Sequence, residues 1–153
     1  MTLWRREQGF TLLEIVVVLA IVAMLAAIAL PAMPRATSRA MLEAYALKTA
    51  ALLKEDRNAA VRRGTAVATQ LSANARTLRS GATGHVLQLP RDVDFRAVLA
   101  SQCGERTGGT EVEFLPSGMS CGGTIFLSRP GTTLEVRITW LTGGVEVVKG
   151  HAS

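Results

Sequence analysis

A single acidic residue, Glu14, stands inside a run of apolar residues near the N-terminus. From Phe10 to Leu30 only Thr11 and Glu14 are polar. A carboxylate at a bilayer centre costs about 2.5–3.5 kcal/mol on insertion scales, so an acid in such a run indicates a functional role. A cut just before Phe10 would create an α-amino group, largely protonated at neutral pH, four residues before Glu14. Opposite charges attract strongly in a low dielectric, so Glu14 could pair with that amine or with the amine of a neighbouring chain.

The two cysteines, Cys103 and Cys121, are the next candidates for chemistry. A bond between them would close a loop of about 18 residues and stabilise the fold by roughly 3 kcal/mol in the chain-entropy model. Two unpaired, half-buried thiols remain the alternative. The pair lacks Cys-x-x-Cys spacing, and His85 and His151 do not complete a ligand set, so we expect no metal and no cofactor.

The rest of the sequence offers no catalytic constellation, and we expect the chain not to be an enzyme. The two histidines lie in loop-like or terminal settings without a triad context. Asp92 and Asp94 lie close together but are expected on the solvent face of a turn or strand. The glycines near position 105 are not followed by the GK[ST] of a phosphate loop.

The segment around Glu14 has the length and charge of a membrane helix. Its 21 residues, at about 1.5 Å each, would span about 31 Å, close to the bilayer core of about 30 Å. Arg5 and Arg6 precede it and predict a cytoplasmic N-terminus. Three interpretations compete: a plain anchor, a signal peptide cleaved near 27–29, and a leader cut before the apolar stretch. Only the third gives Glu14 a role.

The basic balance of the chain does not point to nucleic acid. The net charge is +5, from 17 Lys+Arg against 12 Asp+Glu. Without residues 1–9, which carry two arginines and one glutamate, the count is 15 against 11, or +4. The basic residues are scattered and form no run typical of a nucleic-acid arm. Nucleic acid is therefore not expected as the main partner.

The N-terminal string GFTLLE, from Gly9 to Glu14, resembles the processing motif of type IV pilins and type II secretion pseudopilins. A short basic leader and an unbroken apolar run accompany it, as in that family. The resemblance implies cleavage between Gly9 and Phe10 and N-methylation of Phe10 by a prepilin peptidase. It also implies an inner-membrane anchor, a periplasmic C-terminal domain and an assembly role for Glu14.

The resemblance and the local patterns divide the chain into three parts. Residues 1–9 form the leader, 10–34 the transmembrane and assembly helix, and 35–153 the periplasmic pilin-like domain. Pro31 fits pilin-like helices with a kink at this depth, although Pro31 and Pro34 could equally end the membrane helix. The class is α+β: a long N-terminal helix packed on a small antiparallel β domain.

Residues 35–63 are rich in strong helix formers and predict the second half of that helix. Ala40, Ala44, Leu47 and Ala51 fall on one stripe, which is expected to pack on the domain. Gly64 suits the helix C-cap.

The β domain is expected over 65–149, from several short runs of alternating apolar residues. Residues 72–84 and 101–110 are expected to be loops. Trp140 alternates with Val136 and Ile138, so it is expected in the core, and Gly143-Gly144 predicts a two-residue hairpin. The expected strands are 65–71, 85–89, 111–115, 124–127, 134–141 and 145–148.

The soluble part resembles one branch of the family more than others. LKEDRNAAVRRGTAV, PSGMSCGGTIFL and LEVRITWLTGGVEV are similar to the helix end and closing strands of minor pseudopilin H of type II secretion. The last match is looser, because Leu141 separates Trp140 from Thr142-Gly143. This implies a minor pseudopilin near the filament tip, with other pseudopilins, prepilin peptidase and the inner membrane as partners. The alternative is a FimT/FimU-type minor pilin of a type IV pilus, which could touch DNA during uptake.

Overall fold

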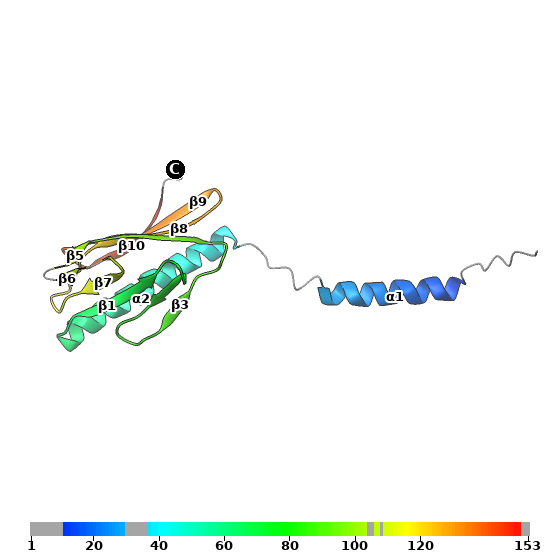
Figure 1. Ribbon diagram of the computed structural model, residues 1–153, viewed down its shortest axis with the longest axis horizontal. Coiled ribbons are helices and arrows are strands. Elements are labelled where there is room, and N and C mark those ends of the chain that lie inside the picture. The colour runs from blue at the N-terminus through cyan, green and yellow to red at the C-terminus, as the bar shows by residue number, and fades with distance from the viewer. Residues whose placement is uncertain (1–10, 30–36, 104–105, 108, 151–153) are drawn as a thin grey trace, which may run out of the picture. The chain divides into compact units, whose positions relative to one another are not determined.

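The computed structural model of this chain describes residues 11–29, 37–103, 106–107 and 109–150. The chain divides into two units, Met1–Ala36 and Thr37–Ser153, and each is described by itself. The first holds helix α1 (Leu12–Ala29), and the second holds helix α2 (Arg39–Arg63) and the strands (Figure 1). The strands are β1 (Val67–Ser72), β2 (Thr77–Arg79), β3 (Val86–Gln88), β4 (Asp94–Leu99), β5 (Gln102–Cys103), β6 (Arg106–Thr107), β7 (Glu111–Phe114), β8 (Gly123–Arg129), β9 (Thr132–Ile138) and β10 (Val145–Lys149).

Helix α2 has a defined residue at each end. Ser38 precedes it in an extended conformation, and its side chain accepts a hydrogen bond from the Met41 amide at 3.2 Å. Gly64 closes it in the left-handed conformation (φ 64°), which glycine adopts without steric cost. The basic residues Arg62 and Arg63 occupy the last turn, where the helix dipole favours positive charge. The predicted C-cap is therefore confirmed.

The strands form two four-stranded antiparallel sheets and one small hairpin. Sheet A has the order β3-β2-β1-β7, sheet B the order β10-β9-β8-β4, and β5 pairs with β6. Helix α2 packs against β1 and β7 of sheet A and against β8, β9 and β10 of sheet B, so the helix lies along both sheets (Figure 1). The predicted α+β class, a helix packed on a small antiparallel β domain, is confirmed.

The core lies between α2 and the inner faces of the two sheets. Leu42 and Leu53 of α2, Phe114 of sheet A, and Ile125 and Val136 of sheet B are fully buried. In β8 and β9 the apolar residues Ile125, Leu127, Leu134, Val136 and Ile138 are buried at alternate positions, as expected for an antiparallel sheet with one covered face. This single core joins elements far apart in the sequence.

The face of α2 that is buried differs from the predicted one. The stripe of Ala40, Ala44, Leu47 and Ala51 is exposed. The opposite stripe is buried instead, and it contains polar residues that apolar periodicity does not count. Its members are Leu42, Ala46, Thr49, Ala50, Leu52, Leu53, Asp56, Ala59 and Ala60.

Several strand assignments from the sequence also need correction. The expected loop 72–84 contains β2, a short strand held between β1 and β3 that contributes one fully buried side chain, Leu78. The expected loop 101–110 contains the β5-β6 hairpin, and β4 was not expected at all. Strand β9 ends at Ile138, and its turn into β10 runs through residues 139–144 instead of a two-residue hairpin.

A buried carboxylate ties α2 to sheet A. Asp56 is fully buried and accepts hydrogen bonds from the hydroxyls of Thr69 (2.6 Å) and Ser80 (2.5 Å). It also accepts from the backbone amides of Gly81 (3.0 Å) and Ala82 (3.1 Å). Four donors around one carboxyl group replace the hydrogen bonds to water that burial removes. Asp56 therefore fixes the β2-β3 turn and β1 to the helix.

We expect Asp56→Ala to lower the free energy of unfolding of the Thr37–Ser153 unit by at least about 3 kcal/mol, because it leaves buried donors without an acceptor. Chemical denaturation followed by circular dichroism measures this. The neighbouring exposed residue provides the control, since Glu55→Ala should change the same quantity by about 0.5 kcal/mol or less. Equal effects of the two substitutions would contradict the role given to Asp56.

Candidate functional site

Helix α1 begins with a local capping arrangement that places Glu14 in its first turn. The Thr11 carbonyl accepts from the amides of Glu14 (3.0 Å) and Ile15 (3.3 Å). The Thr11 hydroxyl accepts from the Glu14 amide at 3.3 Å, half of the Thr-x-x-Glu capping box. A carboxylate in the first turn also faces the positive end of the helix dipole. Local forces thus favour Glu14 at this position and hold it at the helix start.

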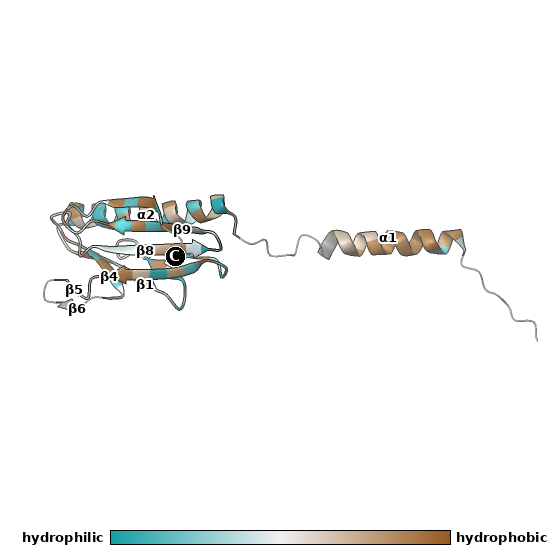
Figure 2. Ribbon diagram, turned by 90° about the horizontal axis from the view of Figure 1, so that it is seen from above, coloured by the Kyte–Doolittle hydropathy of each residue, from teal (hydrophilic) through white to brown (hydrophobic). Residues whose placement is uncertain are grey.

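From Leu12 to Ala27 the side chains of α1 are exposed, and all of them except Glu14 are apolar, so every side of the helix is apolar. Figure 2 shows α1 brown along most of its length. The exposed fractions include 85% for Leu12, 71% for Met24 and 62% for Leu25. At about 1.5 Å per residue its 18 residues extend about 27 Å. Helices that are apolar all round are normally buried, in a large core, in lipid or among other helices.

Among the residues that the structure describes, no helix has both the length and the hydropathy needed to cross a bilayer.

The second unit holds its first residue firmly. Thr37 is 3% exposed, and its amide and hydroxyl both donate to the Asp92 carboxylate, the hydroxyl at 2.8 Å. The Thr37 carbonyl accepts from the Arg129 guanidinium. The hydrogen bond from the Thr37 amide and, to a smaller extent, the one from its hydroxyl hold the pKa of Asp92 below its usual range. These contacts join the start of α2 to the loop before β4 and to the end of β8.

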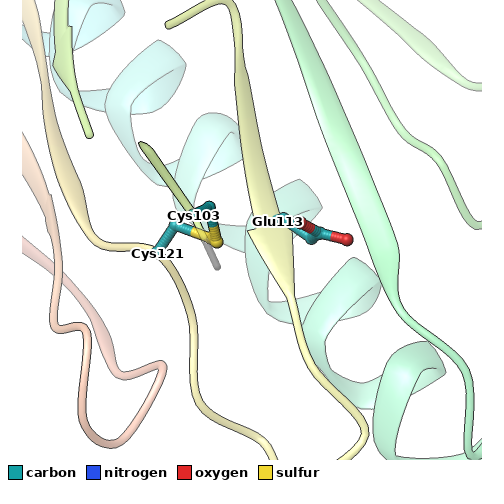
Figure 3. Close-up of side chains that lie close together, drawn as sticks. All are labelled: Cys103, Glu113 and Cys121. Carbon is teal, nitrogen blue, oxygen red and sulfur yellow. A yellow bond between two sulfur atoms is a disulfide. The ribbon is translucent and has the colours of Figure 1, made fainter. Parts of the chain in front are cut away.

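The two cysteines meet beside β7. Cys103 of β5 and Cys121, ahead of β8, form a disulfide across 18 positions of sequence (Figure 3). The Cys121 amide donates to the Glu113 carbonyl at 3.1 Å. Glu113 lies on β7 and is 7% exposed. One oxygen of its carboxyl group lies within 4.8 Å of both sulfurs. The sulfurs are bonded to each other, so they are not thiolate ligands, and the arrangement pins the β5-β6 hairpin against sheet A.

Comparison with known proteins places this arrangement among pilin-like proteins. Residues 4–30 match the family described as the prokaryotic N-terminal methylation motif. The type II secretion system protein H of Xanthomonas campestris pv. campestris is 28% identical over 141 residues, which cover 92% of this chain and 83% of that protein. The chain thus carries a methylation motif of this kind and resembles type II secretion system protein H over most of its length.

Solved structures share the fold of this pilin-like chain. The minor pseudopilin EpsH from the type 2 secretion system of Vibrio cholerae superposes with a TM-score of 0.55 at 13% identity, covering 70% of this chain and 95% of that one. The type IV minor pilin FimU of Pseudomonas aeruginosa gives 0.56 at 17% identity, covering 73% and 91%. Identities this low establish the fold alone.

The candidate residues from the sequence are placed as follows in the pilin-like chain. Gly9 and Phe10 lie outside the described residues, as do His151 and the two prolines after α1. Glu14 lies in the first unit, and the disulfide lies in the second. His85 is exposed immediately before β3. Trp140 is 65% exposed, so the core position predicted for it is wrong.

The sequence did not reveal Asp56 or the contacts of Asp92. Asp56 lies on the buried stripe of α2, three positions after Leu53 and four before Ala60, and this spacing could have signalled a buried acid. Asp92 is exposed, as expected, but its partner Thr37 is 55 positions away, and nothing local announces that pairing. Contacts of this kind depend on the tertiary fold.

The lowered pKa of Asp92 predicts how pH acts on the start of the second unit. A carboxyl whose pKa is lower in the folded state stabilises the fold above its unfolded pKa of about 3.9 and loses that contribution as pH falls through the folded pKa. We expect the difference in stability between the unaltered chain and Asp92→Asn to be constant above about pH 5 and to shrink below about pH 4. Denaturation at a series of pH values measures it.

A conservative variant isolates the cause of this shift. Thr37→Val keeps the size of the side chain and the backbone amide but removes the hydroxyl donor to Asp92. NMR titration of the Asp92 carboxyl should then give a pKa closer to the ordinary value. An unchanged titration in Thr37→Val would refute the contribution of that hydroxyl.

Proposed function

We propose that this chain is a minor pseudopilin of a type II secretion system, cleaved between Gly9 and Phe10, N-methylated at Phe10 and assembled through α1 into a periplasmic pseudopilus near its tip. The observation that carries the proposal is the joint presence of a methylation motif over 4–30 and an apolar helix with one acid in its first turn. The domain fold shared with EpsH supports it. Other pseudopilins and prepilin peptidase are then its partners.

The role of Glu14 follows from electrostatics. Cleavage before Phe10 leaves a positive amine four residues before the carboxylate of Glu14, at a helix end whose dipole already favours negative charge. In a packed bundle of apolar helices, an amine without a partner would cost several kcal/mol. The Glu14 carboxylate, in the first turn of α1, neutralises its own amine or that of an adjacent subunit. It therefore favours one axial register between neighbouring helices. The exposed apolar surface of α1 supplies the nonspecific part of the attraction.

The location also follows from the chemistry of the two units. Arg5 and Arg6 precede the apolar run, which favours a cytoplasmic leader, an inner-membrane α1 and a periplasmic domain. The Cys103–Cys121 disulfide supports an oxidising compartment such as the periplasm. The relatives are named as a type II secretion system protein and as a minor pseudopilin, and no catalytic role is proposed for this chain.

A FimT/FimU-type minor pilin of a type IV pilus is the second candidate, because the fold matches FimU as well as it matches EpsH. The sequence match to type II secretion system protein H favours the pseudopilin. Salt-sensitive DNA affinity of the second unit would favour the pilus alternative.

Mass spectrometry of the mature N-terminus tests the processing step. We expect a polypeptide that begins at Phe10 and carries one added methyl group, in cells that contain the peptidase. Gly9→Val should leave the chain uncut, because the glycine before the cut is part of the motif. A mature chain that begins near Leu30, as after a signal peptidase, would overturn the proposal.

Glu14→Gln tests the assembly step. We expect normal cleavage but at least about tenfold less filament incorporation, since the amine then lacks its charged partner. Cross-linking of membranes followed by immunoblotting measures incorporation. Glu43→Gln is the matched control: it removes a glutamate from the exposed Arg39–Glu43 pair, and surface pairs contribute little. Full incorporation of the Glu14→Gln chain would refute the role of Glu14.

A further inference from the structure

Two loops at one end of the second unit present large apolar side chains to solvent. Trp140 is 65% and Leu141 is 55% exposed on the turn between β9 and β10. Met119, 36% exposed, lies on the loop after β7, and Val61, 48% exposed, lies near the end of α2. A side chain on Gly118 would contact the Val61 methyl at 3.5 Å, so α2 and this loop are adjacent. We call these four residues the distal patch.

The loops that carry the distal patch are held in place. The Arg57 Nε donates to the carbonyls of Gly118 and Thr142, both at 3.1 Å, and so ties the two loops to α2. The Ser120 amide donates to the Trp140 carbonyl at 2.9 Å, and the Thr139 amide donates to Gly144 at 2.9 Å. Trp140 is thus an exposed aromatic on a fixed backbone. Fixed aromatic anchors of this kind dominate binding energy in protein interfaces.

Positive charge borders the distal patch on one side. A hollow beside the turn is lined by Lys54, Arg57 and Asn58 together with residues 143–145. In the part of the chain that the structure describes, no carboxylate forms an ion pair with Lys54 or Arg57. Of the two acids between Lys54 and Arg57, Asp56 is buried against sheet A, and Glu55 lines a different hollow, with Lys48 and His85. The surface therefore offers apolar contact next to uncompensated cations.

We propose that the distal patch is the docking site for a different pilin-like subunit, one that presents an apolar side chain flanked by carboxylates. The charge of the hollow selects the acidic flank, and Trp140 with its neighbours selects the apolar residue. A second copy of this chain in a two-fold contact would bring Lys54 and Arg57 against their own copies, which is repulsive. This proposal rests on the proposed function, because it assumes assembly with other subunits.

The position of the patch fits such a partner. Arg57 and Val61 follow the helix start at Arg39 by 18 and 22 residues, roughly 27–33 Å along the axis. The chain enters the second unit beside that start, at Thr37. The distal patch is therefore at the end of the domain opposite the entry of the chain at Thr37, where a neighbouring subunit can stack. Nucleic acid fits less well, since the patch has one aromatic ring and three aliphatic side chains instead of a row of stacking rings.

The sequence supplies a selective probe. The chain has two tryptophans, Trp4 and Trp140, so the full chain with Trp4→Phe reports on Trp140 alone. We would label it with 5-fluorotryptophan, place it in detergent micelles and add the other pilin-like subunits of the same secretion system one at a time. We expect one of them to shift the single fluorine resonance, with an affinity that falls as salt rises.

Variants decide where that subunit binds. Trp140→Ala and Lys54→Glu should each weaken binding at least about tenfold by calorimetry. The control Leu47→Ala, 62% exposed on α2 two turns before Lys54 and roughly 21 Å along the axis from Val61, should change it by less than about twofold. Four results would each overturn the docking site. They are equal binding by all three variants, binding by none of the subunits, self-association without a partner, and a resonance shift caused by a 12-nucleotide single strand.

The same preparations separate this proposal from the proposed function. Mass spectrometry reports whether the chain from peptidase-containing cells begins at Phe10. A correctly processed chain that assembles independently of Trp140 and Lys54 refutes the docking site and leaves the pseudopilin assignment intact. A chain with a different start refutes the pseudopilin assignment itself.

Discussion

An apolar helix with one acid has no stable place in water, and this constraint governs the organisation of the chain. The side chains of α1 are exposed wherever the structure describes them, and burying each large one would contribute about 1.5–3 kcal/mol. The second unit has its own complete core, built on α2 and both sheets, so its folding does not require α1. The chain can therefore keep a folded domain while α1 remains available for lipid or for other helices.

Within the second unit, α2 is the element on which both four-stranded sheets pack. Its buried stripe contacts both sheets, and Asp56 on that stripe accepts hydrogen bonds from donors of β1 and of the β2-β3 turn. Arg57, the next residue, donates hydrogen bonds to the carbonyls of Gly118 and Thr142. It therefore holds the loop after β7 and the turn between β9 and β10 against α2. Two adjacent residues on one helix thus fix the turns of two different sheets, which explains how a domain with short strands holds its loops in place.

Sequence patterns predicted the parts of the fold that depend on neighbouring residues. The α+β class, the helix end at Gly64 and the apolar N-terminal segment follow from propensity, capping and composition. The buried face of α2 did not follow, because alanine is common on both faces and the true stripe contains Thr49 and Asp56. Strand β2 was not predicted for a similar reason: it is short and polar, and only Leu78 reaches the core. Its pairing with β1 and β3, not its own sequence, makes it a strand.

Trp140 shows why the exposed turn between β9 and β10 could not be predicted from sequence periodicity. Alternation from Leu134 through Val136 and Ile138 is real, and all three are buried. The chain then turns at Thr139, where its amide bonds to the Gly144 carbonyl and the ladder with β10 ends. Beyond that point the period of two no longer fixes which side of the sheet a residue faces. An aromatic residue two positions past the end of β9 is exposed by the turn, and a fixed turn that exposes tryptophan is better explained by a partner than by the core of its own domain.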